Sequence, residues 1–523
     1  MTLEGPRPTG SAFRLYQTFQ GETHMSTGGA PAEVSPNSGD SNADSKRWWS
    51  LTTVLLSTFM AQLDNTVVNV ALPSIGQDLN LQISGIEWII SSYMLVFSAL
   101  LLLGGRLADL LGTRRVLMIG IIVFTIASLF AGLADSFGML MAGRAVQGVG
   151  AALSTPATLM IILTTFKDDR ERGKAIGLWG AVIALSFAFG PIVGGVLTRY
   201  IDWGWIFFIN VPIGVAAVAI GLWSIDKNAG VTQSRRLDTP GLISSGVVLF
   251  GLTYALIEGP KEGWTTTPIL ASFAAVVLAL IVFCLVETRF RDPMFDLTLF
   301  RNGTFTWGTA ALVLWGCGMM GVFAYTSLYL QNVLDFSPIL AGAVFVPLAV
   351  VMAVVATISG KLAEKFGVLR TVLVGFVVAA VGLALLAVPD EHASTWDLQV
   401  ALILVGLGAG AVTPLQTAVA GALPVTKVGV ASGVLNAFRE MSALCGVTVL
   451  GAVVSSVTAG RIESGDGPKI AYLSGYHSGV LIASALIFAG AVTALLALRP
   501  GRAAVDAAET EPAPQESMAP AEG

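Results

Sequence analysis

The chain is poor in charged residues, cysteine and histidine for its length of 523 residues. Only 12% of the residues are charged, whereas 54% are hydrophobic. Soluble domains carry roughly 25% charged residues, so a soluble fold could not cover this much apolar surface. The net charge of −5 and the lack of a lysine-rich tract argue against a nucleic-acid partner. The composition therefore predicts a protein of the lipid bilayer.

Sequence signals for bound cofactors are also missing. The three cysteines, Cys284, Cys317 and Cys445, fall in apolar stretches, as small buried hydrophobes do, and do not suggest a disulfide framework. There is no Gly-x4-Gly-Lys-Ser/Thr loop for ATP and no His-Glu-x-x-His for a metal. We therefore expect no ATP site, no metal and no cofactor. Energy must come from an ion gradient or from the gradient of the substrate itself.

What the sequence does contain is a series of fourteen apolar runs of about 20 residues, each long enough to cross a hydrocarbon core of about 30 Å as a helix. We therefore predict an all-α polytopic membrane protein with fourteen transmembrane helices. We place the spans near residues 50–72, 88–105, 116–134, 138–165, 175–198, 205–224, 240–258, 268–287, 305–330, 338–359, 371–388, 398–420, 429–457 and 478–498.

Lysine and arginine are distributed unevenly between the two predicted sides. With both termini in the cytoplasm, the tails and inner loops hold 23 of the 29 basic residues, the outer loops hold four, and two lie inside spans. Inner loops of membrane proteins carry such an excess of basic residues. We therefore expect a multi-pass protein of the cytoplasmic membrane with both termini in the cytoplasm.

The chain also repeats itself at a constant offset of 255 residues. The matching groups follow the second and the tenth predicted spans: Gly105, Asp109, Gly112 and Arg115, then Gly360, Glu364, Gly367 and Arg370. Both copies start from the same side of the membrane, so the repeat is parallel, and two such halves can provide alternating access. We predict a disordered tail (1–47), a six-helix half (48–225), an inserted central helix pair with linkers (226–303), a second six-helix half (304–498) and a disordered tail (499–523).

Three further short sequences occur in order within the first half. They are LDNTVVNVALP at residues 63–73, RAVQGVG at 144–150 and GPIVGG at 190–195. Together with the repeated loops they resemble the major facilitator superfamily, specifically its fourteen-span drug:proton antiporter branch. The resemblance covers roughly residues 50–498. It implies the major facilitator fold and the export of drugs, antibiotics or secreted metabolites in exchange for protons.

Asp64 and Arg144 are the strongest candidates for proton coupling. Asp64 lies nine residues from Pro73, or ~13 Å along a helix, and Arg144 lies seven residues from Phe137, or ~10 Å. An ionised carboxylate in lipid is costly, so Asp64 needs a partner, a cavity or a proton. Because the two residues have similar depths, we expect them to be coupled, directly or through water. A purely structural buried pair is the alternative.

The other motifs carry weaker predictions. The resemblance implies that the repeated Gly105 and Gly360 loops form a gate between the halves. It also implies that Gly190, Pro191, Gly194 and Gly195 form the antiporter motif, although simple helix packing explains the glycines equally well. Gln147, Arg439 and Glu440 are candidates for a substrate site or a second proton site; neighbouring helix positions point about 100° apart, so the last two need not pair. Glu87, Glu258 and Glu287 sit at span ends, where we expect an interfacial position.

Two alternatives to a proton-coupled exporter remain open at this stage. One is an importer or uniporter of a small solute, and the other is a membrane sensor or enzyme. The latter needs a soluble domain or a catalytic cluster inside the membrane, and neither is visible in the sequence. We expect a monomer whose partners are a small-molecule substrate, protons and the lipid bilayer.

Overall fold

A computed structural model describes residues 38–226, 238–289, 297–423 and 428–499, and all regular secondary structure in these ranges is helical. The prediction of an all-α protein is therefore confirmed. The elements are α1 (Ser38–Asp78), α2 (Ile83–Leu111), α3 (Thr113–Gly132), α4 (Phe137–Thr165), α5 (Asp169–Tyr200), α6 (Trp205–Phe208), α7 (Asn210–Ser224), α8 (Thr239–Glu262), α9 (Thr267–Arg289), the 3-10 helix η1 (Leu297–Arg301), α10 (Gly303–Asn332), α11 (Pro338–Val344), α12 (Val346–Phe366), α13 (Val368–Leu385), α14 (Thr395–Gly410), α15 (Thr413–Gly421), α16 (Val428–Glu463) and α17 (Pro468–Ala497).

The chain divides into two units, residues 1–45 and 46–523. In the first unit the described structure is the beginning of α1, which starts at Ser38, within the tail predicted for residues 1–47. The disorder predicted for residues 1–37 and for the end of the chain beyond residue 499 lies outside the described residues, as do parts of the predicted linkers. Everything below concerns the second unit.

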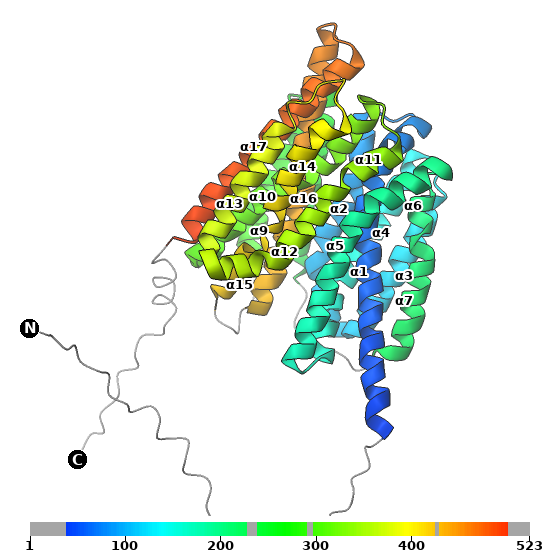
Figure 1. The fold of residues 1–523 in the computed structure, drawn as a ribbon, viewed down its shortest axis with the longest axis vertical. Coiled ribbons are helices and arrows are strands. Elements are labelled where there is room, and N and C mark those ends of the chain that lie inside the picture. The colour runs from blue at the N-terminus through cyan, green and yellow to red at the C-terminus, as the bar shows by residue number, and fades with distance from the viewer. Residues whose placement is uncertain (1–37, 227–237, 290–296, 424–427, 500–523) are drawn as a thin grey trace, which may run out of the picture. The chain divides into compact units, whose positions relative to one another are not determined.

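The repeat at an offset of 255 residues is visible in the helix boundaries and in the packing. The bounds of α2, 83 and 111, plus 255 give 338 and 366, which are the bounds of α11 and α12 taken together. Within the first half α4 packs against α2 and α3, and within the second half α14 packs against α12 and α13 in the same way. In Figure 1 the first half runs from blue to blue-green, and the second half runs from green through yellow to red.

The two halves meet along two seams. At one seam α2 packs against α16, and at the other α5 packs against α11 and α12. The two seams are equivalent under the repeat. α2 corresponds to α11 and α12, and α5 corresponds to α16, so each seam joins the same pair of corresponding helices. α8 and α9 pack against each other, and α8 also contacts α2 and α16, so the predicted inserted pair lies against the first seam.

A glycine turn joins the corresponding helices in each half. Gly112 lies between α2 and α3 with a φ of 92°, and Gly367 lies between α12 and α13 with a φ of 87°. Only glycine adopts such a backbone conformation without strain, so the repeated glycines are explained by the sharp turn. We call this side of the bundle the Gly112 end, and the side at which α1 carries Pro73 the Pro73 end.

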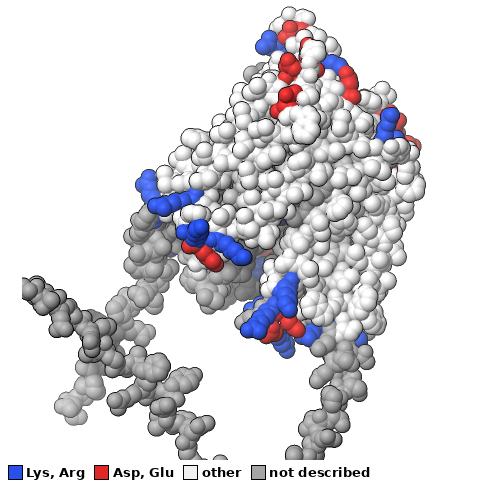
Figure 2. Space-filling model, viewed as in Figure 1, with Lys and Arg blue, Asp and Glu red and all other residues white. Residues whose placement is uncertain are grey.

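Twelve helical segments within the described residues are long and apolar enough to cross a membrane. They comprise every predicted span except the first and the fifth, which correspond to α1 and α5. On the face shown in Figure 2, charged side chains gather near the two ends, and the surface between them is uncharged. Such a belt suits contact with lipid tails, since charges are costly in the hydrocarbon core.

Candidate functional site

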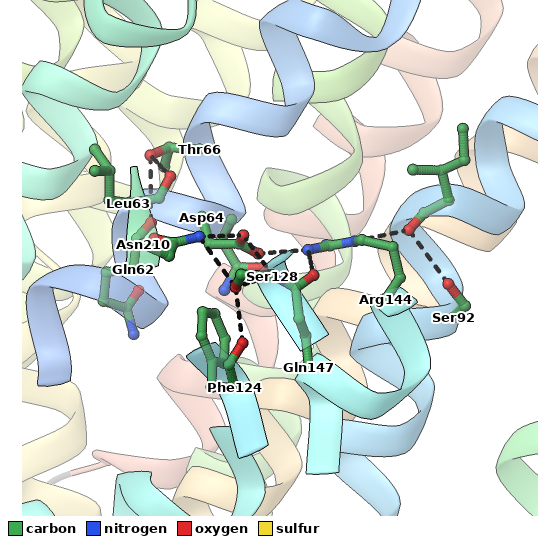
Figure 3. Close-up of polar contacts among 12 residues, drawn as sticks. Gln62, Leu63, Asp64, Thr66, Ser92, Phe124, Ser128, Arg144, Gln147 and Asn210 are labelled. Carbon is green, nitrogen blue, oxygen red and sulfur yellow. Dashed lines mark hydrogen bonds and ion pairs between the residues drawn. The ribbon is translucent and has the colours of Figure 1, made fainter. Parts of the chain in front are cut away.

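Arg144 and Asp64 form a direct ion pair in the interior of the first half (Figure 3). An arginine Nη atom of α4 donates a hydrogen bond to Oδ2 of the aspartate on α1. The side chains are 1% and 0% exposed. Two opposite charges can share such a place because each compensates the cost of burying the other.

Three neutral side chains complete the network around the carboxylate. Gln147 Nε2 donates to Asp64 Oδ1 at 3.0 Å and to the Ser128 hydroxyl at 2.8 Å, while its own Oε1 accepts from Arg144 at 3.0 Å. Asn210 Nδ2 also donates to Asp64 Oδ1, at 3.1 Å. Asp64 therefore accepts hydrogen bonds from one cation and two amide groups. Gln147 thus belongs to the ion-pair network and not to the cavity lining.

Arg144 is held from its other side by α2 and an aromatic ring. Its Nε donates to the backbone carbonyl of Ile89 at 3.2 Å, and its guanidinium lies 4.5 Å from the centre of the Tyr93 ring. The planar guanidinium allows hydrogen bonds at its edge and an aromatic contact on its face at the same time. The position of the cation is therefore fixed by α1, α2 and α4 together.

A cavity of about 480 Å³ lies beside this network and reaches the Gly112 end. It is lined by residues of both halves, among them Thr58, Gln62 and Trp179 from the first half and Asn436, Arg439 and Glu440 from the second. Pockets for drug-sized ligands have volumes of roughly 300–1,000 Å³. Asp64 and Arg144 are not among the lining residues. The ion pair is therefore sealed from the cavity in this conformation.

Arg439 and Glu440 form a second ion pair, at the cavity wall. Arg439 Nη2 and Nε lie 2.8 Å and 3.2 Å from Glu440 Oε1. We expected that adjacent helix positions need not pair, but the long arginine side chain folds back along α16 to reach its neighbour. The cavity therefore presents a pair of compensated charges, with the arginine side chain 37% exposed and the glutamate side chain 14% exposed.

The repeated loops of the predicted gate differ between the halves. In the first half Gly105 and Asp109 line the cavity and Gly112 is buried, whereas Arg115 is exposed. In the second half Gly360, Glu364, Gly367 and Arg370 are all exposed. Their role as a gate stays a prediction. Next to the first loop, Arg114 is buried and donates a hydrogen bond to the Leu222 carbonyl.

The glycines of the predicted antiporter motif bring α5 against two other helices. A Cβ atom at Gly190 would overlap the Thr66 side chain of α1, and one at Gly194 would lie 2.8 Å from the Val67 carbonyl oxygen. Gly195 faces α11, where a Cβ would lie 2.6 Å from the Pro338 carbonyl oxygen. Pro191 lies within α5, and its carbonyl faces Gly342 of α11. Close helix packing therefore accounts for these residues, and their part in antiport stays a prediction.

The interfacial position expected for two glutamates is wrong. Glu87 is 2% exposed and Glu287 is 4% exposed, so both are buried. Proximity to a span end gives the depth of a residue, but not whether its side chain faces lipid headgroups or another helix. Glu258 is closer to the expectation, since its side chain is 13% exposed and 3.5 Å from the exposed Lys261.

Four further residues belong to the ion-pair network but were not predicted from the sequence: Ile89, Tyr93, Ser128 and Asn210. Asn210 had a usable signal, since it is a polar residue directly after an apolar helix start. Ser128 and Tyr93 had none, because single hydroxyl residues are common within apolar spans. The backbone carbonyl of Ile89 cannot be identified from a side-chain pattern at all.

Comparison with known proteins agrees with this architecture. The chain is 36% identical over 453 residues to the puromycin resistance protein pur8 of Streptomyces alboniger, covering 84% of this chain and 88% of that protein. It is 33% identical over 416 residues to the multidrug resistance protein Stp of Mycobacterium tuberculosis, covering 78% and 76%. It is 34% identical over 406 residues to the methylenomycin A resistance protein of Bacillus subtilis, covering 77% and 87%.

The fold also matches a solved structure. A bacterial homologue of the human lysosomal transporter Spinster superposes with a TM-score of 0.64 at 17% identity, covering 88% of this chain and 98% of that one. The sequence itself matches the Major Facilitator Superfamily over residues 54–447 and 349–518. A multi-pass bundle with this match is a transport protein and not an enzyme. The chain belongs to the Major Facilitator Superfamily.

Proposed function

We propose that the protein is a proton-coupled exporter of amphipathic small molecules that works by alternating access. The observation that carries the proposal is the buried Asp64–Arg144 pair, sealed beside a cavity of about 480 Å³ lined by both halves. Relatives that carry names of antibiotic and multidrug resistance support the choice of drugs, antibiotics or secreted metabolites as substrates.

Two helices connect the ion pair to the cavity. α1 carries Asp64 and, one turn or less away, Ala61 and Gln62 of the cavity lining. α4 carries Arg144 and also Ser154, Thr158 and other lining residues. A substrate that displaces either helix therefore acts on the contact between the two charges. Separating them leaves Asp64 without its cation, and a carboxylate in an apolar interior then favours uptake of a proton.

The proposal includes a specific topology. α1 and α5 are the two further spans beside the twelve apolar segments, which gives fourteen, with α8 and α9 as a pair inserted between the halves. α1 was not counted among the twelve, and Gln62, Asp64, Asn65 and Asn69 make it more polar than a simple span. With the Gly112 end in the cytoplasm, the cavity faces inward and both termini are cytoplasmic. We further propose that the protein acts as a monomer in the cytoplasmic membrane.

Transport by the purified protein in proteoliposomes tests this function. Puromycin is the first probe, because a relative is named for resistance to it. An imposed pH gradient should drive puromycin uphill in the direction opposite to proton flow, and a protonophore should abolish the movement. Movement of puromycin with the protons indicates an importer, and movement that is independent of the pH gradient indicates a uniporter. Either result rejects proton-coupled export.

A further inference from the structure

Glu87 is a buried carboxyl group outside the proposed transport site. It belongs to α2 in the first half and lies near the Pro73 end, at the seam with α16 of the second half. Its Oε1 accepts hydrogen bonds from the Tyr325 hydroxyl of α10 at 3.1 Å and from the Ser455 hydroxyl of α16 at 3.2 Å. Its Oε2 is buried and has no hydrogen-bond partner among the described residues. This carboxyl group therefore bridges the two halves.

The surroundings of Glu87 contain no compensating cation within the described part of the chain. None of the ion pairs found there includes Glu87. The titratable groups that face it are Tyr325 from α10, Tyr472 from α17 and Glu258 from α8. Glu258 has partners of its own, since it accepts from the Trp88 indole at 2.8 Å and pairs with Lys261. Glu87 thus differs from Asp64, which is equally buried but lies against Arg144.

The repeat shows that packing alone does not require a carboxyl group at this place. Residue 87 plus the offset of 255 is Gly342, at the other seam. There a Cβ would overlap the Pro191 carbonyl, so the two backbones touch directly. At the first seam Gly451 leaves room for the carboxyl group of Glu87, since a Cβ at residue 451 would lie 2.5 Å from Glu87 Oε1. One seam is closed by backbone packing, and the corresponding seam is closed around a carboxyl group.

We propose that Glu87 is a second proton-binding site, separate from Asp64, and that the Pro73 end closes around its protonated form. An ionised carboxylate without a cation is costly in a closed, apolar seam, whereas the neutral carboxyl carries no uncompensated charge and can keep the two hydrogen bonds that Oε1 accepts. Opening the seam hydrates the group and relieves that cost. Deprotonation therefore favours the open seam, and protonation favours the closed one. The inference rests on the alternating access proposed above, but not on Asp64 or on the nature of the substrate.

A distance measurement across the Pro73 end tests the site. One spin label replaces Asp135, in the exposed loop between α3 and α4, and the other replaces His392, whose side chain is 82% exposed, between α13 and α14. The three native cysteines are replaced by alanine, and the full chain is measured by double electron–electron resonance in lipid nanodiscs from pH 5 to pH 8. We expect the population with the longer distance to grow as the pH rises.

Two substitutions and one control assign the effect to Glu87. Glu87→Gln keeps the shape and removes the titration, so we expect the pH-dependent shift to be lost and the short distance to persist. Ser455→Ala removes a donor that favours the ionised carboxylate, so the midpoint of the shift should move to higher pH. The control is Glu258→Gln, which removes a neighbouring carboxyl group at the same end and should leave the shift in place.

The outcomes separate this site from the transport function. A full shift in Glu87→Gln, or an unchanged midpoint in Ser455→Ala, would overturn the assignment to Glu87. A distance that is independent of pH in the unsubstituted protein overturns it as well. Failure of the proposed export function would be seen in a different experiment, as puromycin transport that does not depend on the pH gradient. Should Glu87→Gln fail to insert into the membrane, the midpoint in Ser455→Ala still decides the question.

Discussion

At the scale of single residues, the two buried carboxyl groups have opposite environments. Asp64 has a cation and three amide or hydroxyl groups around it, all buried with it. Glu87 has two hydroxyl donors and no cation among the described residues. The first arrangement stabilises a charge inside one half, and the second suits a neutral group between the halves. If both groups bind protons as proposed, these different environments suit different steps of the transport cycle.

Asp64→Asn is the direct test of proton coupling. Asparagine keeps the size and can still accept from Arg144, so the protein should fold and bind substrate. Without a titratable group at this place, export driven by a pH gradient should fall roughly tenfold or more. The measurement is puromycin transport in proteoliposomes. Asp78→Asn is the matched control on the same helix. Asp78 is exposed, and asparagine can still accept the hydrogen bond that the Trp203 indole donates at 2.9 Å, so transport should not change. Full activity of Asp64→Asn would reduce the pair to a structural role.

Arg144→Ala tests how strongly the network depends on its cation. The substitution leaves Asp64 as a buried, unpaired charge, and breaking a buried pair in this way costs about 3–5 kcal/mol. We expect a clear loss of thermal stability of the detergent-solubilised protein. The double variant Asp64→Asn/Arg144→Ala should recover part of the loss, because the unpaired charge is gone. A double variant that is less stable than Arg144→Ala would show that the two charges do not depend on each other.

Sequence reasoning found Asp64 and Arg144 because charged residues are rare inside apolar spans and the two had similar depths. The same reasoning did not predict the burial of Glu87. This residue lies directly before the start of a predicted span, where many side chains face the lipid headgroups. Depth follows from counting residues along a helix, whereas the helix face that meets a partner depends on packing between distant segments. Tyr325 and Ser455, which are 238 and 368 residues from Glu87, supply that packing.

At the scale of helices, α5 determines how closely the halves approach at the second seam. Gly195→Ala places a methyl group 2.6 Å from the Pro338 carbonyl oxygen and 2.7 Å from the Ile339 Cα atom, so the backbone of α11 has to move. Overpacking of this kind costs about 1–3 kcal/mol. Here it destabilises only the conformation in which the Pro73 end is closed. We expect a longer distance between labels at residues 135 and 392 and slower transport.

Gly180→Ala is the control for this prediction, because it adds the same methyl group to the same helix. Nothing lies within 4 Å of a Cβ atom at Gly180, so distance and transport should not change. Equal effects of the two substitutions would mean that the loss of glycine from α5, and not contact with α11, is responsible. The sequence alone could not have separated these glycines, since the pattern of small residues gives no neighbour across the seam.

At the scale of the whole molecule, the repeat could be recognised in the sequence because its repeated glycines are required by the backbone conformation. Gly112 and Gly367 both occupy sharp turns with positive φ, so they recur at a fixed offset even though the surrounding side chains differ. The cavity and the seams could not be located in the same way, because they depend on the relative position of the halves. A sequence repeat identifies which helices correspond to each other, but not how the two halves are positioned relative to each other.

Cysteine labelling can test whether α8 and α9 cross the membrane. If the pair crosses the membrane, the loop between the two helices lies outside and the Gly112 end lies inside. Thr265 is exposed in that loop, and Lys365 is exposed at the Gly112 end. In a cysteine-free background, Thr265→Cys should react with a membrane-impermeant maleimide in intact cells, and Lys365→Cys only after the cells are permeabilised. Protection of both positions in intact cells would mean that the pair does not span, because a hairpin lying on the inner face keeps its loop in the cytoplasm. Labelling of Lys365→Cys in intact cells would instead contradict the orientation inferred from the basic residues.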